Sequence, residues 1–276
     1  FYNGSDFAFV PGAGLALRAP NYSSDADFAT SATALTSAQS NEITGSFSNA
    51  AVTIDSLKIN GAQALTMTGL LTIRTAGTTN ASGGIIQTGG SGSISGTGVT
   101  TGGSGALVIN VDGGANTLTL NAPITSTTTG GFTKVGAGTL IIAGLNAQTG
   151  VNSINDGTVQ LATGGRLSAG GTTATLSIRQ GAVLDLNGVN VSVGIDDFNN
   201  NGTVTNTNAA AVTLTIGNSN GAGTSFGIID QTNGVINLTK LGTGAMSWNG
   251  LSTYTGVTTI SSTGIITVNN VADGGF

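Results

Sequence analysis

Residues 132–154 read FTKVGAGTLIIAGLNAQTGVNSI, and residues 238–260 read LTKLGTGAMSWNGLSTYTGVTTI. The two stretches lie 106 residues apart, align without a gap and are identical at ten of 23 positions. Such repetition is typical of stacked architectures, in which each unit buries its apolar face only against its neighbours. The repeat therefore indicates a fibrous or surface protein.

Composition favours strands over helices. Glycine supplies 46 of the 276 residues, and 7% of residues are charged, against roughly 25% in ordinary globular domains. Aromatic residues make up 5% of the chain, so the core must be built from Val, Ile, Leu and Ala. Gly, Thr, Ser and Asn are poor helix formers and suit short strands joined by frequent turns.

Apolar and polar residues alternate with a period of two in many short segments, as half-buried strands require. The clearest segments are 51–59, 64–73, 106–111, 117–120, 175–178, 182–186, 212–216 and 235–238. A sandwich or a propeller would also be all-β. The short strands, frequent Gly corners and only three prolines favour a single-stranded, right-handed parallel β-helix (β-solenoid), elongated, with on the order of a dozen coils of about 20 residues.

We expect one continuous β-solenoid over residues 1–276, with residues 1–50 forming less regular coils or an end cap. The chain begins FYNGSDFAFV, with neither Met nor the pattern of a signal peptide. We therefore expect it to be a processed piece of a longer, exported precursor.

The repeated segment resembles the autotransporter-associated β-strand repeat of bacterial surface and secreted proteins. That pattern runs approximately L-x-K-x-G-x-G-T-L-x-L-x-G-x-N-x-Y-T-G. The positions that carry the resemblance are Lys134, Gly136, Gly138, Gly144 and Gly150 in the first copy and Lys240, Gly242, Gly244, Gly250 and Gly256 in the second. Copy one has Gln148 in place of Tyr, and copy two has Ser252 in place of Asn. The resemblance implies an extended β-helical passenger region at the outer surface of a bacterium or outside the cell.

The shared lysines and aromatic residues have structural and functional interpretations. A basic contact with a ligand is one reading of Lys134 and Lys240. We instead expect each lysine at a solvent-facing corner, with its stem over the coil, because a repeated position is usually a structural one. Trp248 and Tyr254 fit either an adhesive surface patch or the filling of a coil.

A weak calcium site is the metal alternative. The string DFNNNG from Asp197 fits the opening of a calcium loop, with Asp197, Asn199 and Asn201 as ligands. Asn208 stands where such a loop needs a bidentate Glu. A turn rich in Asn explains the string without a metal, so we expect no metal site and no cofactor.

Catalysis is the least favoured function. A β-helical polysaccharide lyase or hydrolase needs converging carboxylates or an acid with a base. The acids are spread singly as Asp55, Asp112, Asp156, Asp185 and Asp230, and the chain has no His. We predict no catalytic residues and no enzymatic activity.

The predicted function is a structural β-solenoid: a fibre, a filament subunit that assembles through its ends, or the shaft of an adhesin. A module that binds glycans or a surface is the alternative. Expected partners are further copies of the chain, other surface components or glycans. No basic patch points to nucleic acid, and no run of 18 apolar residues points to membrane insertion of this segment.

Overall fold

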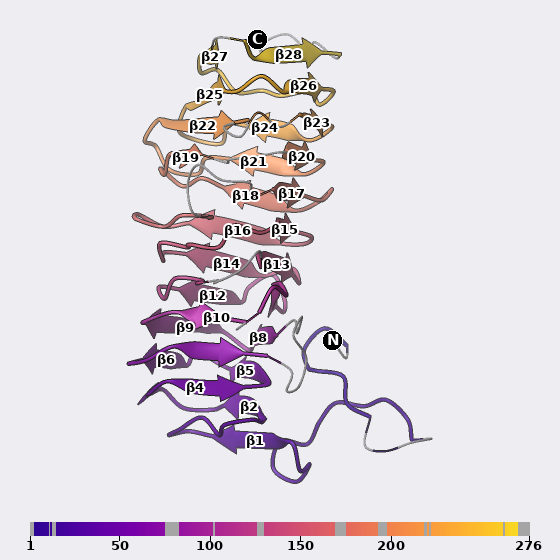
Figure 1. Ribbon diagram of the computed structural model, residues 1–276, viewed down its shortest axis with the longest axis vertical. Coiled ribbons are helices and arrows are strands. Elements are labelled where there is room, and N and C mark those ends of the chain that lie inside the picture. Colours follow the sequence, from indigo (N-terminus) through magenta and orange to yellow (C-terminus); the bar gives the residue numbers. More distant parts are fainter. Residues whose placement is uncertain are drawn as a thin grey trace.

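The computed structural model describes residues 3–10, 12, 15–74, 83–101, 103–125, 130–168, 175–192, 198–217, 220, 222–261 and 263–269, with the backbone alone for residues 198–200. Within these residues the chain is all-β, and its strands stack into a tall column (Figure 1). No described helix is long and apolar enough to cross a membrane.

One side of the column is a 12-stranded parallel sheet that runs its whole height. Its strands, from the N-terminal end, are β1 (Phe28–Ser31), β2 (Ser40–Ile43), β5 (Ser56–Asn60), β8 (Gly84–Thr88), β11 (Leu107–Val111), β13 (Phe132–Val135), β15 (Asn152–Ile154), β17 (Leu176–Ile178), β20 (Phe198–Asn200), β23 (Gly223–Ser225), β26 (Ala245–Trp248) and β28 (Ile265–Val268). Each strand of this sheet belongs to a successive rung, so the expected parallel β-solenoid is confirmed.

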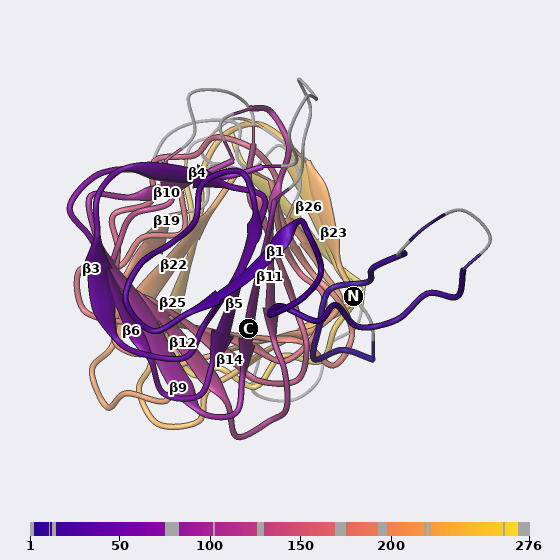
Figure 2. The same cartoon turned by 90° about the horizontal axis from the view of Figure 1, so that it is seen from below.

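Two further sides complete the coil. The second side is a nine-stranded parallel sheet of β3 (Phe47–Asn49), β6 (Ala64–Met67), β9 (Ser91–Gly96), β12 (Thr117–Leu120), β14 (Thr139–Ile142), β16 (Thr158–Leu161), β18 (Val183–Asp185), β21 (Thr203–Thr205) and β24 (Ile228–Asp230). The third side has a three-stranded sheet of β4 (Val52–Ile54), β7 (Leu71–Ile73) and β10 (Val99–Thr100), followed by a four-stranded sheet of β19 (Val191–Ser192), β22 (Val212–Ile216), β25 (Ile236–Lys240) and β27 (Thr258–Ile260) (Figure 2).

The core fills the bore of the column. In most strands of the column alternate residues point inward and are buried, as Leu118 and Leu120 are in β12. Inward residues of successive rungs stack because the parallel register places like on like: Leu118 pairs with Leu140, which pairs with Val159. One cluster of buried apolar residues extends from Leu35 to Tyr254. Its burial supplies the main driving force for folding.

Most of the alternating segments form strands, as predicted, but two of them are each divided into two strands by a corner. Segments 117–120 and 212–216 are strands β12 and β22. Segment 51–59 divides at Asp55 into β4 and β5, which belong to different sides. Segment 64–73 divides in the same way at residues 68–70. In segment 64–73 the buried positions keep their period of two across the corner, whereas in segment 51–59 the phase shifts where Ser56 and Leu57 are both buried.

The two copies of the repeat do not occupy the same sides of the column. In the first copy, β13 and β14 belong to the 12- and nine-stranded sheets. In the second copy, the matching strands β25 and β26 belong to the four- and 12-stranded sheets. Five steps along the 12-stranded sheet, from Phe132 to Ala245, take 113 residues, seven more than the offset between the copies. The 106-residue offset equals about five rungs of roughly 20 residues, which predicts that both copies lie on similar faces of the column. This prediction is wrong, because the second copy is displaced by one side.

The described residues before β1 lie beside the column (Figure 2). Phe9 and Arg18 form an isolated antiparallel bridge there. The Asn110 side-chain amide of β11 donates to the Gly4 carbonyl, and Lys58 of β5 pairs with Asp6. The segment thus contacts the outer face of the 12-stranded sheet over several rungs.

Candidate functional site

The repeated lysines are buried, so their expected solvent-facing position is wrong. Lys134 is 0% exposed and Lys240 is 1% exposed. Each extends from an inward position at the end of a strand. The Lys134 ammonium donates to the carbonyls of Val135 at 2.9 Å, Gly136 at 2.6 Å and Asp156 at 3.2 Å. The Lys240 ammonium donates to the carbonyls of Leu241 and Gly242.

These ammonium groups stabilise sharp corners. Turn carbonyls that point into the coil have no ladder partner, and an unpaired buried carbonyl is costly. The corner after Lys134 turns at Gly136, whose φ is +79°, and the corner after Lys240 turns at Gly242, whose φ is +67°. Burial lowers the pKa of Lys134 to about 8 although the charge of Asp156 opposes this shift. Burial also lowers the pKa of Lys240.

Gln87 has the same role at the corner between β8 and β9, and the sequence interpretation missed it. Its side chain is fully buried, and its amide nitrogen donates to the carbonyls of Gly61, Thr88 and Gly90. A Cβ at Gly92 would overlap the Gln87 side-chain oxygen. An inward polar residue at a strand end, followed closely by glycines, is the signal that could have revealed Gln87.

Several repeat glycines lie where a side chain has no room. A Cβ at Gly136, Gly144, Gly242, Gly250 or Gly256 would overlap the backbone of the preceding rung, and one at Gly138 would overlap nearby backbone and the Val111 side chain. Gly150 is buried, and Gly244 is partly buried. The spacing of these glycines follows from the close stacking of corners.

Trp248 and Tyr254 fill the coil, so they do not form an adhesive patch. They are 0% and 1% exposed. The Trp248 indole N–H donates to the Ser252 hydroxyl at 3.0 Å, and the Tyr254 and Thr258 hydroxyls lie 2.7 Å apart. Ser252 also accepts the backbone N–H of Ile229 from the rung below.

The first copy fills the equivalent space with amides. Asn146 accepts the backbone N–H of Ile124, as Ser252 does for Ile229. Gln148 donates to Asn152 and to the carbonyl of Leu167. The Asn146 side-chain nitrogen and the Gln148 side-chain oxygen are buried without a partner in the described part of the chain. Relative to the second copy, Ile142 and Gln148 are smaller than Trp248 and Tyr254, and Asn146 is larger than Ser252. The two copies therefore fill this space with side chains of different size and polarity.

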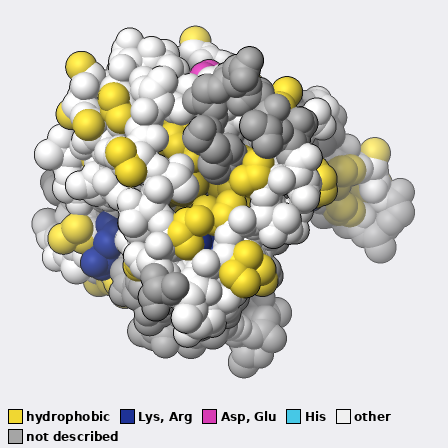
Figure 3. All heavy atoms as spheres, turned by 90° about the horizontal axis from the view of Figure 1, so that it is seen from above, with side chains coloured by type: hydrophobic (Ala, Val, Ile, Leu, Met, Phe, Trp, Pro, Cys, Tyr) yellow, Lys and Arg dark blue, Asp and Glu magenta, His cyan; other side chains and the backbone are white. Residues whose placement is uncertain are grey.

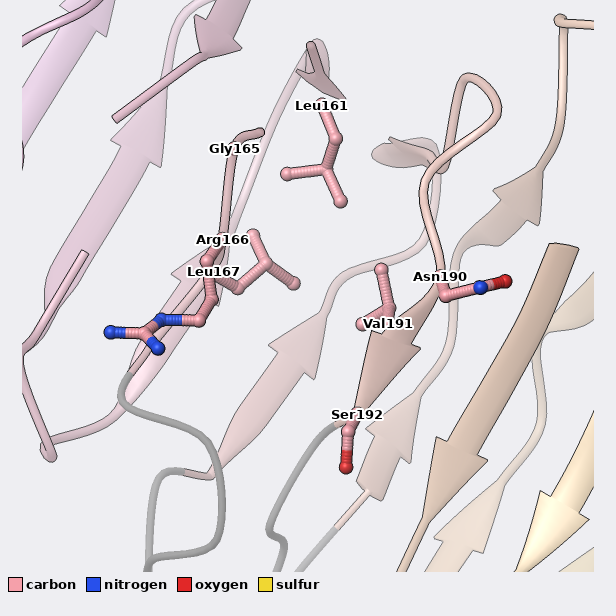
Figure 4. A pocket seen from close by; sticks show the side chains of 7 residues that line it. All are labelled: Leu161, Gly165, Arg166, Leu167, Asn190, Val191 and Ser192. Atoms are coloured by element: carbon pink, nitrogen blue, oxygen red, sulfur yellow. The ribbon is translucent and has the colours of Figure 1, made fainter. Parts of the chain in front are cut away.

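The third side of the column has a break between its three-stranded and four-stranded sheets. Between β10 and β19, the described residues of that side form isolated bridges, from Val99 to Ile124 and from Leu145 to Arg166, and no named strand. A pocket of about 160 Å³ lies at this break, lined by Leu161, Gly165, Arg166, Leu167, Asn190, Val191 and Ser192 (Figure 4).

This pocket is small and mainly apolar. Leu161, Leu167 and Val191 converge in it, whereas the Arg166 side chain extends away (Figure 4). Arg166 donates through Nε to the carbonyl of Asn146. Pockets for small molecules usually enclose about 300–1,000 Å³. The break is therefore a packing irregularity between rungs of unequal length.

A second, open groove lies on the third side of the first rungs. It encloses about 320 Å³ and is lined by Ser37, Ala51, Val52, Thr53, Leu70 and Thr72. Its hydroxyl groups offer donors and acceptors but no charge.

The dispersed acids do not assemble into a cluster of ligands. No group of three or more His, Cys, Asp or Glu side chains suited to a metal occurs among the described residues. Asp197 and the side chain of Asn199 lie outside them, and the backbone N–H of Asn201 donates to Ile178. The calcium alternative thus stays untested.

Asp185 is the most buried of the dispersed acids, at 2% exposure. Its carboxylate accepts from the Gln160 amide, the Thr207 hydroxyl, and the backbone N–H groups of Asn187 and Thr207. These four uncharged donors tie three rungs together. The Asp185 carboxylate therefore has a structural role in the column.

Comparison with known proteins supports the repeat assignment. No family model and no solved structure matches the chain. Over 169 residues, or 60% of this chain, the sequence is 34% identical to the protein named Adhesin BmaC autotransporter of Brucella suis biovar 1 (strain 1330). The chain spans about 5% of the length of that relative. This similarity, together with the parallel β-solenoid, confirms the resemblance of the chain to a β-helical autotransporter passenger region.

Proposed function

We propose that this chain is a non-enzymatic section of a bacterial surface adhesin, exposed outside the cell, and that it acts as a stiff shaft. The observation that carries the proposal is the 12-stranded parallel sheet, which continues from β1, beginning at Phe28, to β28, ending at Val268. Continuous backbone ladders and a filled bore give a rod that resists bending. Similarity to an autotransporter adhesin supports the surface location.

A display fusion on the bacterial surface tests the role as a shaft. A display fusion that carries residues 1–276 between a surface anchor and a known binding domain should hold the binding domain farther from the cell than a fusion without them. The distance can be measured by electron microscopy with a labelled binding domain. An unchanged distance would contradict the role as a shaft.

The finer proposal is end-to-end association with a second copy. The C-terminal rung presents apolar side chains at the end of the column (Figure 3). Ile260 and Ile265 are 48% and 53% exposed, and inward Ile266 and Val268 are only partly buried. Strand edges of the end rung offer N–H and C=O groups for pairing with another rung. Stacking of a second copy would bury both the apolar groups and the edge.

Sedimentation over a range of concentrations tests self-association, with electron microscopy of the same samples. We expect rods longer than one column at high concentration. Ile266→Lys should suppress them, whereas Leu145→Lys, at a residue 62% exposed on the side of the column, should not. Single rods at every concentration would overturn end-to-end association but not the role as a shaft.

Glycan binding is the second candidate, and the open groove on the third side favours it. Ser37, Thr53 and Thr72 could present hydroxyls to a neutral sugar chain there. A glycan array should then show binding that Thr53→Val and Thr72→Val weaken. An array without binders would remove this candidate.

A further inference from the structure

A lysine and two acids meet on the outer face of the 12-stranded sheet. Lys58 Nζ lies 2.6 Å from Asp6 Oδ2 and 3.3 Å from Glu42 Oε1. The three side chains are 12%, 14% and 15% exposed, in the order Lys58, Asp6 and Glu42. A nucleophilic amine and a carboxyl group are thus held in contact and largely shielded from water.

The fold brings these groups together from distant parts of the sequence. Glu42 of β2 and Lys58 of β5 are direct partners in the parallel register. Asp6 comes from the segment beside the column, 52 residues before Lys58. The Asn60 side chain donates to Glu42 Oε1 at 3.1 Å and helps fix that carboxylate.

Aromatic side chains cover the cluster and anchor its N-terminal part. The Tyr22 ring lies 5.1 Å from Lys58 Nζ. Phe28 of β1 makes edge contacts with Tyr22 and Phe9, at centroid distances of 5.3 Å and 5.0 Å. This cover lowers the local polarity and holds Asp6 against Lys58.

The two oxygens of Asp6 have different surroundings. Oδ1 accepts hydrogen bonds from the Tyr22 hydroxyl and from the backbone N–H of Phe7, each at 2.9 Å. Oδ2 faces Lys58. Burial, and then the charge of Asp6, raise the pKa of Tyr22, so its hydroxyl remains a donor. Two fixed donors on one oxygen are the arrangement that stabilises the oxyanion of an acyl-transfer intermediate.

From this geometry we propose that Lys58 and Asp6 form an intramolecular isopeptide bond, with Glu42 as the proton shuttle. Glu42 takes a proton from the Lys58 ammonium, and the freed amine attacks Cγ of Asp6. Negative charge gathers on Oδ1, facing Tyr22 and Phe7. Oδ2 then leaves as water, with one proton returned through Glu42 and a second from the attacking nitrogen.

The reaction balances without an oxidant or a cofactor. One C–N bond forms, one C–O bond breaks, and an ammonium and a carboxylate become an amide and one water. Proximity lowers the barrier to this reaction, because groups held in contact react as if at very high concentration. The product would tie the N-terminal segment covalently to the fifth strand of the shaft, across a loop of 52 residues.

Mass spectrometry of the full chain tests the bond. The intact mass should be lower than the sequence mass by one water. Trypsin should cleave after Arg18 and Arg74 but not after Lys58, and should release the peptide that ends at Arg18 joined to residues 19–74. An intact mass equal to the sequence mass, with normal cleavage after Lys58, would overturn the proposal and leave an ion pair.

Three variants separate chemistry from folding. Lys58→Arg keeps the charge without the amine and should have the full sequence mass. Glu42→Gln should also lose the cross-link while circular dichroism shows the native β-sheet. Asp27→Asn, which changes an exposed acid of the same segment, should retain the cross-link. A cross-linked Glu42→Gln chain would exclude Glu42 as the shuttle.

Discussion

Lys134 and Lys240 hold the same position in the two copies of the repeat, yet Lys134 belongs to the 12-stranded sheet and Lys240 to the four-stranded sheet. Both are buried, and both donate to the carbonyls of the next two residues. The repeat therefore specifies one corner and the two strands that flank it, independently of the side on which the corner falls. A functional surface built from both copies would need them on one side, which this arrangement excludes.

Replacement of Lys134 should show how much its corner depends on the ammonium. Lys134→Met keeps the apolar stem but leaves three partly buried corner carbonyls without this donor. We expect unfolding free energy to fall by about 2–3 kcal/mol, measured by urea denaturation. Arg179→Met, at an exposed residue, provides a comparison for the loss of a cation outside the bore. A stability of Lys134→Met equal to that of the wild type would show that the corner carbonyls do not need the lysine.

The stability contributed at Lys134 should rise with pH. Its pKa is lowered from 10.5 to about 8 by burial, so between these values the unfolded chain binds more protons at this position than the folded chain. Unfolding free energy therefore increases as pH rises from about 8 to about 10.5. The difference in stability between wild type and Lys134→Met, measured at pH 7.5 and pH 10, isolates this effect from other titrating groups. A difference that does not grow with pH would contradict the buried site of Lys134.

Substitutions at two glycines can separate the loss of stability due to backbone conformation from the loss due to steric overlap. Gly136 and Gly164 have φ of +79° and +86°. A Cβ at Gly164 would meet nothing within 4 Å, whereas one at Gly136 would overlap Asn110 and Val111. Gly164→Ala should cost about 1–2 kcal/mol, the penalty of a left-handed residue. Gly136→Ala should cost clearly more, and equal losses in thermal unfolding would show that stacking of corners adds nothing.

Much of this architecture was predictable because a β-solenoid repeats one simple pattern. The alternation in 117–120 and 212–216 placed β12 and β22 correctly. The burial of Lys134 was not predictable from residue type, since a lysine is normally exposed, and only the unpaired carbonyls of its corner make burial favourable. The displacement of the second copy by one side of the column was also not predictable from the sequence. Rungs vary in length, and a difference of seven residues is enough to move the motif to the next side. The contact of Asp6 with Lys58 depends on a segment outside the repeat pattern.

Trp248 should report burial at the C-terminal rungs. It is the chain's single tryptophan and is 0% exposed. Its fluorescence should be blue-shifted and poorly quenched by acrylamide, and Trp248→Ala should cost about 3–5 kcal/mol. Trp248→Phe, which keeps the ring but loses the bond to Ser252, should cost less. Strong quenching in the native protein would contradict the burial of Trp248.

Gln148 and Asn152 should be energetically coupled, because the second copy fills the same space with Tyr254 and Thr258. Gln148→Tyr alone places a larger ring against Asn152, and Asn152→Thr alone removes the oxygen that accepts the backbone N–H of Phe132. Each should destabilise the chain. In the double variant, the shorter threonine makes room for the ring and its hydroxyl can pair with the tyrosine, as Thr258 pairs with Tyr254 at 2.7 Å. The double-mutant cycle should therefore show a favourable coupling of about 0.5–3 kcal/mol. Gln148→Tyr combined with Thr66→Ala, at an exposed residue of β6, should be additive. If the changes in unfolding free energy were additive for both pairs of substitutions, positions 148 and 152 would not be coupled as Tyr254 and Thr258 are.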